Sequence, residues 1–262
     1  MIFEAQAARI GRPIEESYRA TREFVSLFAQ AIIQSFVPPY RVKDIFKQLS
    51  FMAAESAPVV IFCLCFAAVV TIIESSFHMK LIIQNDSLVP GFAALLIIRE
   101  LGAVVTALLV TSRVGAGIAA EVGSMQITEQ IDALKMLGIN PVRFLVVPRF
   151  VASLLGGVLL TIIANCVCLY VAMLVSEVKL GYTPGSFIMA MRAFVHFKDM
   201  FFATIKGACF GAVIPIFSCY FGFRCKSGAE GVGLATTNSV VATSVAIIII
   251  DFVLSWVFSY LY

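Results

Sequence analysis

The sequence predicts an all-α polytopic membrane protein with about five transmembrane helices, preceded by an N-terminal interfacial helix. Of the 262 residues, 60% are hydrophobic and only 13% are charged, whereas a soluble domain carries roughly 25% charged residues. Five long apolar stretches follow an amphipathic N-terminal segment. These stretches are apolar on every side, which argues against a β-barrel, because barrel strands alternate apolar and polar residues.

Residues 1–50 are expected to form a cytoplasmic N-terminal region with one amphipathic helix over 15–36. Apolar residues recur there at helical spacing, and Pro38-Pro39 predicts the end of the helix. Residues 1–23 mix Arg with Glu and lack an apolar core, which excludes a signal peptide. An apolar stripe between charged flanks favours a helix in the membrane interface. Packing against another protein is the alternative.

Residues 51–262 are expected to form a single transmembrane domain, in which each apolar stretch is near the roughly 20 residues that span a bilayer. On the N-terminal side of the membrane, the connecting segments hold thirteen Lys and Arg residues, against four on the other side. The positive-inside rule therefore predicts a cytoplasmic N-terminus and a C-terminus on the far side. The predicted spans cover about 51–73, 88–112, 150–175, 199–223 and 240–262.

Charged residues lie inside the predicted spans, and four of them are more than five residues from either end. Arg99 and Glu100 are near the middle of the second span and Asp251 is near the middle of the fifth, while Lys206 is close to one end of the fourth, where it could snorkel. A charge at the bilayer centre costs about 2.5–3.5 kcal/mol on insertion scales, so such residues face the bundle, a cavity or a partner. They either line a polar pocket in a substrate path, with Arg99, Glu100 and Asp251 as the candidates, or form ion pairs that fix helix packing. Neighbouring residues on a helix point about 100° apart, so Arg99 and Glu100 cannot both face one narrow seam.

A short cytoplasmic helix is predicted over 128–138, between the second and third spans. Thr128 and the acidic residues after it are a helix start, while Gly138 and the pair Asn140-Pro141 are a helix end. Such a helix either docks into a groove of a partner and transmits force, or closes the loop at the membrane surface. The pattern leaves both interpretations open.

Small residues predict close helix approaches at Gly156-Gly157 and at Gly207 and Gly211, which internal packing explains as well as oligomerisation does. The chain has no Walker A, HExxH or GxSxG sequence. We therefore expect no catalytic residue, no metal site and no cofactor on this chain, and any ATPase must be another chain.

Two segments resemble a known family. TEQIDALKMLGINPVRFLVVPRF at 128–150, with RELG at 99–102, is similar to the signature of the MlaE/YrbE family of ABC-transporter permeases. GVGLATTNSVVATSVAIIIIDFVLS at 231–255 resembles the closing motif of that family. Ala103 departs from the pattern, because the family usually carries proline after RELG.

The resemblance implies a permease domain over 51–262, in the transmembrane subunit of an MCE-type ATP-driven transporter. Such subunits form homodimers in the bacterial inner membrane and move phospholipids to or from a periplasmic MCE protein, contributing to outer-membrane lipid homeostasis. A cytoplasmic ATPase dimer holds ATP and Mg, often with a small STAS-domain protein, and no nucleic-acid partner is expected. Arg99 and Glu100 would lie near a central lipid cavity. The helix that contacts the ATPase would carry Glu129, Gln130, Asp132, Ala133, Leu134 and Gly138.

Two other functions stay open from the residues alone. An ion-coupled secondary transporter would use Arg99, Glu100 and Asp251 as a relay and would work without an ATPase. A membrane scaffold or intramembrane enzyme is the third hypothesis, and the lack of a recognisable catalytic set argues against the enzyme.

Overall fold

The computed structural model describes residues 2–38, 41–79, 81, 88–226 and 228–261. Every regular element in these ranges is a helix. Five helices are long and apolar enough to cross a membrane, which confirms the predicted all-α fold with five spans. They cover Val42–His78, Val89–Ile127, Val142–Leu180, Phe197–Phe223 and Gly228–Tyr260.

These five helices are longer than the apolar stretches that predicted them. The second extends furthest at one end, because it continues to Ile127 instead of ending near residue 112. Its last part, α6 (Ala116–Ile127), is rich in small residues and remains helical although its sequence is less apolar. The predicted loop over 113–149 is therefore mostly helical.

Short π-helical segments join the α-helices within the first three of these long helices. The first comprises α2 (Val42–Leu49), η1 (Ser50–Ala54) and α3 (Ala57–His78). The second comprises α4 (Val89–Leu96), η4 (Ile97–Val105), α5 (Thr106–Val110), η5 (Thr111–Gly115) and α6. The third comprises η6 (Val142–Val146), α8 (Val147–Val175) and η7 (Ser176–Leu180). The other elements are α1 (Ile2–Ser35), α7 (Gln130–Met136), α9 (Pro184–Phe194), α10 (Phe197–Phe223) and α11 (Gly228–Leu261).

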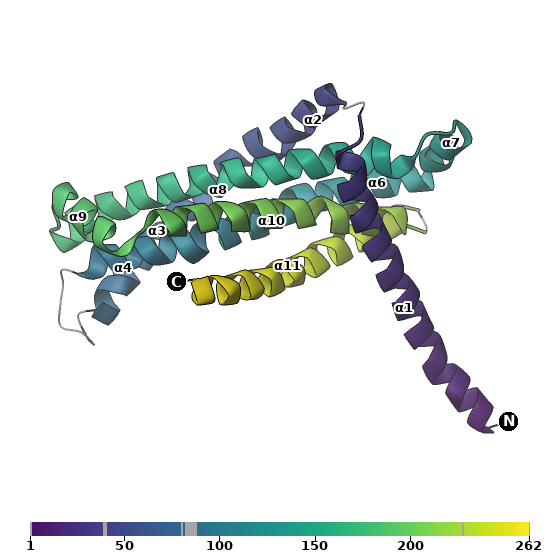
Figure 1. The fold of residues 1–262 in the computed structure, drawn as a ribbon, viewed down its shortest axis with the longest axis horizontal. Coiled ribbons are helices and arrows are strands. Elements are labelled where there is room, and N and C mark those ends of the chain that lie inside the picture. The colour runs from purple at the N-terminus through teal and green to yellow at the C-terminus, as the bar shows by residue number, and fades with distance from the viewer. Residues whose placement is uncertain (1, 39–40, 80, 82–87, 227, 262) are drawn as a thin grey trace.

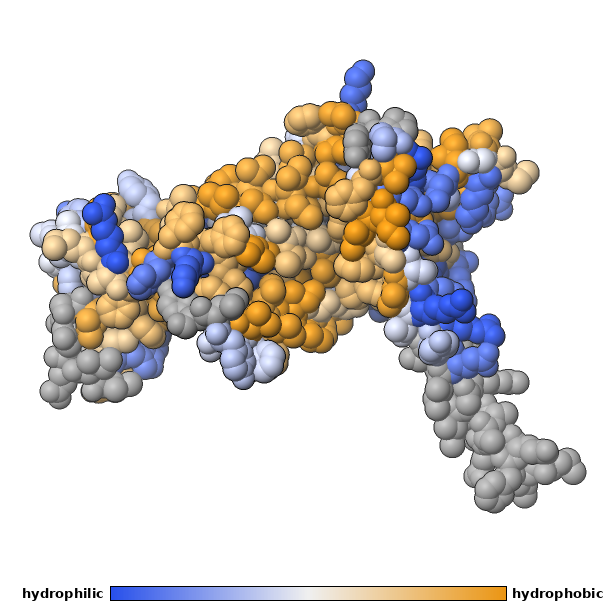
Figure 2. Space-filling model, viewed as in Figure 1, coloured by the Kyte–Doolittle hydropathy of each residue, from blue (hydrophilic) through white to orange (hydrophobic). Residues whose placement is uncertain are grey.

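The long helices lie side by side, with α7 at one end of the bundle and α9 at the other (Figure 1). We call these the α7 end and the α9 end. Hydrophobic residues cover the middle of the face in Figure 2, and hydrophilic residues gather toward its two ends. Such a belt is the surface expected of a helical bundle that crosses a membrane.

The N-terminal helix α1 crosses the bundle at a steep angle near the α7 end (Figure 1). It ends at Ser35, close to the end predicted from Pro38. The ring of Phe24 lies 4.5 Å from that of Phe217 and 5.5 Å from that of Tyr220, so α1 packs on α10 through aromatic side chains. Pro39, Lys80 and residues 82–87 lie outside the described residues.

Helices α8 and α10 meet through glycines. A Cβ atom added to Gly157 would overlap the carbonyl oxygen of Gly207, and one added to Gly211 would overlap that of Ser153. The hydroxyl of Ser153 also donates a hydrogen bond of 2.6 Å to the carbonyl of Gly211. The predicted small-residue contacts therefore serve packing within one chain, where they let the two backbones touch.

Candidate functional site

A cluster of ion pairs joins three of the membrane-crossing helices, and Lys206 of α10 is its centre. The Lys206 ammonium nitrogen lies 3.0 Å from a carboxylate oxygen of Glu100 in η4 and 2.7 Å from one of Asp251 in α11. It also donates a hydrogen bond of 3.0 Å to the carbonyl of Arg99. The expectation that Lys206 snorkels toward the membrane surface is wrong, because its side chain is 0% exposed. Ion pairing explains why a buried ammonium group is tolerated there.

Arg99 makes the second link of the cluster, to Asp199 in the first turn of α10. Its Nε and Nη2 atoms lie 2.7 and 2.6 Å from Oδ1 of Asp199, which is also completely buried. The other oxygen of Asp199 accepts a 2.9 Å hydrogen bond from the backbone N–H of His196, as part of a capping box at the start of α10. Sequence reasoning missed Asp199. Its position seven residues before Lys206, two helical turns away on the same face, is the signal that could have found it.

The predicted site residues are therefore brought together, but the cluster is larger than predicted. Two cations meet three carboxylates, from Glu100, Asp199 and Asp251, whereas the sequence suggested two of each. Arg99 and Glu100 contact α10 at different positions, consistent with their divergent directions on the helix. The dense pairing identifies this cluster as the main polar feature inside the described membrane-crossing helices.

The cluster is buried on one side and open on the other. Whereas Lys206 is fully buried, the side chain of Glu100 is 48% exposed and that of Arg99 is 31% exposed. Ser255 of α11 donates a 3.4 Å hydrogen bond to Glu100, so this open side lies along α11. A half-exposed carboxylate inside a membrane-crossing helix must face a cavity or a partner, because lipid chains do not solvate it.

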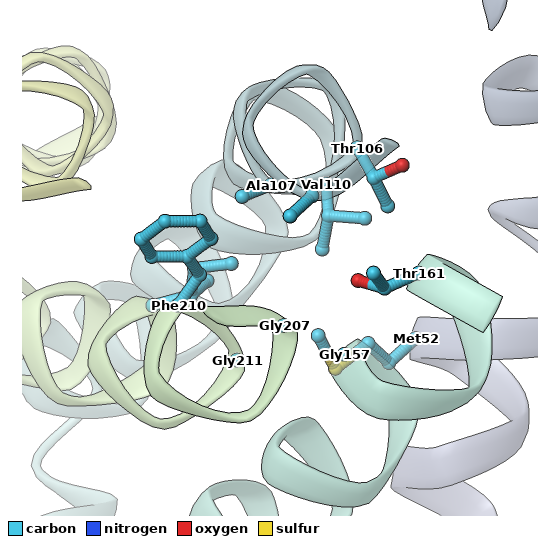
Figure 3. A pocket seen from close by; sticks show the side chains of 11 residues that line it. Met52, Thr106, Ala107, Val110, Gly157, Thr161, Gly207, Phe210 and Gly211 are labelled. Carbon is cyan, nitrogen blue, oxygen red and sulfur yellow. The ribbon is translucent and has the colours of Figure 1, made fainter. Parts of the chain in front are cut away.

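A small cavity lies beside the cluster, toward the middle of the bundle. The free space inside it is only about 10 Å³, and it is lined mainly by apolar groups and glycines, many of them from α5, α8 and α10. Figure 3 shows Gly157 facing Gly207 and Gly211, with the hydroxyl of Thr161 turned toward the space between the helices. Sites for drug-sized ligands have volumes of about 300–1,000 Å³, so this cavity is far too small for such a ligand.

The second predicted site is the connection between α6 and α8. The helix α7 begins two residues later than predicted, because the hydroxyl of Thr128 donates a 2.8 Å hydrogen bond back to Ser124 in α6 rather than capping α7. Glu129 follows with a left-handed backbone, φ = 58°. This conformation costs about 1–2 kcal/mol for a residue with a Cβ atom. Gly138, with φ = 74°, ends the segment as predicted.

The buried side chain of Ile131 packs α7 against the bundle, and most other side chains of α7 are exposed. Ile131 is buried and Leu134 is partly buried, whereas Met136 and Leu137 are 90% and 75% exposed. Asp132 is exposed and pairs with Lys135 at 2.8 Å. The remaining residues predicted to contact a partner are also exposed, namely Glu129, Gln130, Ala133 and Gly138. An exposed apolar tip beside carboxylates is a surface suited to a protein partner.

Within the described ranges, no group of three or more His, Cys, Asp or Glu residues is placed to hold a metal ion. The chemistry that the cluster offers is electrostatic, because its carboxylates and cations can bind charged groups and hydrogen-bonding groups of a ligand.

Comparison with known proteins agrees with the resemblance in the sequence. The profile of the family described as Permease MlaE matches residues 45–257. A "Probable ABC transporter permease protein" of Rickettsia conorii is 34% identical over 234 residues, covering 89% of this chain and 90% of the relative. A protein of Synechocystis with the same description is 31% identical over 251 residues, covering 92% of this chain and 95% of the relative.

A third relative is the chloroplastic protein TRIGALACTOSYLDIACYLGLYCEROL 1 of Arabidopsis thaliana. It is 39% identical over 165 residues, which cover 63% of this chain and 47% of the relative. The match to the family profile extends over far more than half of the chain and includes both charged regions described above. The chain therefore belongs to the MlaE permease family and is a multi-pass membrane permease subunit of a transporter.

Proposed function

We propose that the chain is the transmembrane subunit of an ATP-driven transporter that moves phospholipids between the bacterial inner membrane and a periplasmic MCE protein. The observation that carries this proposal is the open side of the ion-pair cluster. Glu100 and Arg99 are partly exposed inside a membrane-crossing region, next to α11. Charged groups at this depth need polar surroundings, and a lipid headgroup together with water supplies them.

A second copy of the chain would complete the path. Helix α11 is the least buried of the five membrane-crossing helices, with only 11% of its most apolar window buried. In a homodimer, two such faces would enclose a cavity whose charged wall is the cluster. The apolar wall for acyl chains would come from exposed residues of α11, including Val241, Val245, Ile248, Phe252 and Trp256.

The α7 end would face the cytoplasm and dock on a separate ATPase dimer that binds ATP and Mg. Three observations support this docking: the exposed tip formed by Met136 and Leu137, the exposed carboxylates of Glu129 and Asp132, and the left-handed backbone of Glu129. Strained backbone is often kept at sites where a fixed local shape is needed. An amphipathic segment that inserts into a groove of the partner would transmit closure of the ATPase dimer to α6 and α8.

The opposite end would then lie in the periplasm, with the C-terminus on that side and the MCE protein as its partner. A STAS-domain protein would bind the ATPase rather than this chain. The name of the Arabidopsis relative contains the name of a glycerolipid, which supports a lipid as the transported molecule. The Lys and Arg excess on the side of the N-terminus supports the orientation.

The test is transfer of a fluorescent phospholipid by the complex reconstituted with its ATPase and MCE protein. Replacing Glu100 with Gln removes a charge from the open side of the cluster while Lys206 keeps Asp251 as a partner. We expect lipid transfer to fall at least tenfold, with stimulated ATP hydrolysis retained. Unchanged transfer would contradict the proposed path. Transfer that follows a proton gradient and continues without ATP would instead support the ion-coupled relay through Arg99, Glu100 and Asp251.

A further inference from the structure

A second charged cavity lies at the α7 end, far along the bundle from the ion-pair cluster. It has a volume of about 530 Å³ and lies between the end of α1, the residue before α2 and the beginning of the third long helix. Figure 1 shows the end of α1 and the start of α2 close to the beginning of α8. The residues that decide its chemistry are Gln34, Arg41, Ile139, Asn140, Arg143 and Phe144.

Two arginines in the wall of this cavity are held in place by the protein. The guanidinium of Arg41 lies 3.9 Å from the centre of the Phe144 ring, and its Nε is 2.8 Å from a carboxylate oxygen of Asp44. Arg143 donates a 2.7 Å hydrogen bond from one terminal nitrogen to the carbonyl of Pro38. A guanidinium has five N–H donors, and these contacts occupy only some of them. Both arginines are thus positioned with donors to spare for an anion.

The neighbouring cavity shows that the arrangement is selective. It lies on the other side of Arg41 and Phe144, has a volume of about 600 Å³, and also contains Arg149. There, however, Arg149 pairs with Glu121 at 2.8 Å, and Asp44 lines the wall as well. The cavity with Arg143 is lined by no carboxylate among the described residues. Because Arg41 is already paired with Asp44, the charge that this cavity offers an anion comes mainly from Arg143.

The cavity lies at the end of a membrane-crossing helix and combines an apolar wall with cations. The third long helix begins at Val142, so Arg143 and Phe144 lie in its first turn. Phe144, Pro148 and Ile139 give the cavity an apolar wall beside its two arginines. Lipid phosphates lie outside the hydrocarbon core, near the ends of membrane-crossing helices, and such a wall suits a group that carries both a phosphate and acyl chains.

We propose that this cavity binds the phosphate group of a lipid headgroup from the leaflet at the α7 end. The phosphate lies between the guanidinium groups of Arg41 and Arg143. The site is separate from the ion-pair cluster and does not depend on the proposed transport path.

The test is native mass spectrometry of the full-length protein in detergent, titrated with one ligand at a time. Phosphatidylglycerol is expected to bind far more tightly than diacylglycerol, which lacks the phosphate. Equal binding of diacylglycerol and phosphatidylglycerol would overturn the proposal. Inorganic phosphate that binds as tightly as phosphatidylglycerol would show that the site takes free phosphate instead.

Substitutions in the cavity wall test whether the lipid binds at this site. Arg41→Gln combined with Arg143→Gln should weaken phosphatidylglycerol binding at least tenfold, because hydrogen bonds to a charged group are lost. Lys43→Gln is the matched control, since it removes an exposed charge from the same end without lining the cavity. Ile139→Glu keeps both arginines and places a carboxylate in the wall, so it should weaken binding even if the double variant fails to fold. Parent-like binding by Ile139→Glu, in protein that melts at the parent temperature, would overturn the proposal.

Discussion

The ion-pair cluster and the α7 segment are both rich in charge, and they use it in opposite ways. In the cluster, Lys206 and Asp199 are fully buried and each lies within 3 Å of an oppositely charged group. In the α7 segment, Glu129 and Asp132 are exposed, and Asp132 pairs only with a neighbour three residues away. The cluster therefore ties helices of one chain together, whereas α7 presents its charges to the surroundings.

This difference indicates which charged residues stabilise the fold and which are available to a partner. Removing one member of a buried ion pair leaves an uncompensated charge, which is strongly destabilising. Changing an exposed charge usually alters stability by less than about 0.5 kcal/mol. Substitutions in the cluster should thus be read first as structural, and substitutions in α7 as effects on a partner.

The largest expected effect is that of Lys206→Leu. It leaves Glu100 and Asp251 facing each other without a cation, and should lower the free energy of unfolding by about 3–5 kcal/mol. Denaturant titration of the purified protein in micelles measures this loss. Lys226→Leu is the control, because Lys226 is exposed at the α7 end. Equal losses for the two variants would contradict the comparison.

The next effect concerns the glycine contact that supports the cluster. Gly211→Ala places a Cβ atom against the carbonyl of Ser153 and should cost about 1–3 kcal/mol of unfolding free energy through overpacking. Gly233→Ala, in α11, meets no atom within 4 Å, so the same substitution should leave stability unchanged or raise it by up to about 1 kcal/mol. Thermal melting of the two variants, measured side by side, tests this difference in stability. A loss at position 233 matching that at position 211 would disprove tight packing as the cause.

In α7, a charge reversal should separate stability from function. Asp132→Lys breaks only the exposed pair with Lys135, so the free energy of unfolding should change by less than about 0.5 kcal/mol. Stimulation of the ATPase by the reconstituted complex should nevertheless be lost. Intact stimulation, or a complex that assembles as tightly as the parent, would show that this carboxylate does not contact the ATPase.

The smallest expected effect is that of Glu129→Asn. Asparagine tolerates the left-handed backbone better than glutamate does, so stability should stay constant or rise by less than about 1 kcal/mol. ATPase stimulation should fall, because the carboxylate is removed while the local shape is kept. If stimulation is unaffected, the backbone conformation of residue 129, rather than its charge, is what the partner recognises.

Hydropathy was sufficient to predict the five membrane-crossing helices, because lipid exposure demands long apolar stretches. It could not predict that the second helix continues to Ile127, since a helix can continue past its most apolar stretch. Likewise, the sequence shows that Arg99, Glu100 and Asp251 are charged residues inside the predicted spans. It does not show which helices carry the oppositely charged residues that pair with them. Lys206 was undervalued for that reason, because its burial depends on contacts from η4 and α11.

The α7 segment was predicted more closely, because its signals are local. Gly138 ends the segment as expected, since a left-handed residue at a helix end favours glycine. The start was displaced because Thr128 can bond either forward to α7 or backward to α6, and the preceding helix determined the outcome. Tertiary contacts decided what the local pattern left open.

The central claim is that the open side of the ion-pair cluster faces transported lipid. Site-specific photo-crosslinking tests it most directly, with the crosslinking residue at Ser255, beside Glu100, and a control at Phe62, exposed on α3. We predict that phospholipid adducts at position 255 change in yield when ATP is hydrolysed, while adducts at position 62 stay constant. Adducts at position 255 that are absent, or that do not respond to ATP, would contradict the claim.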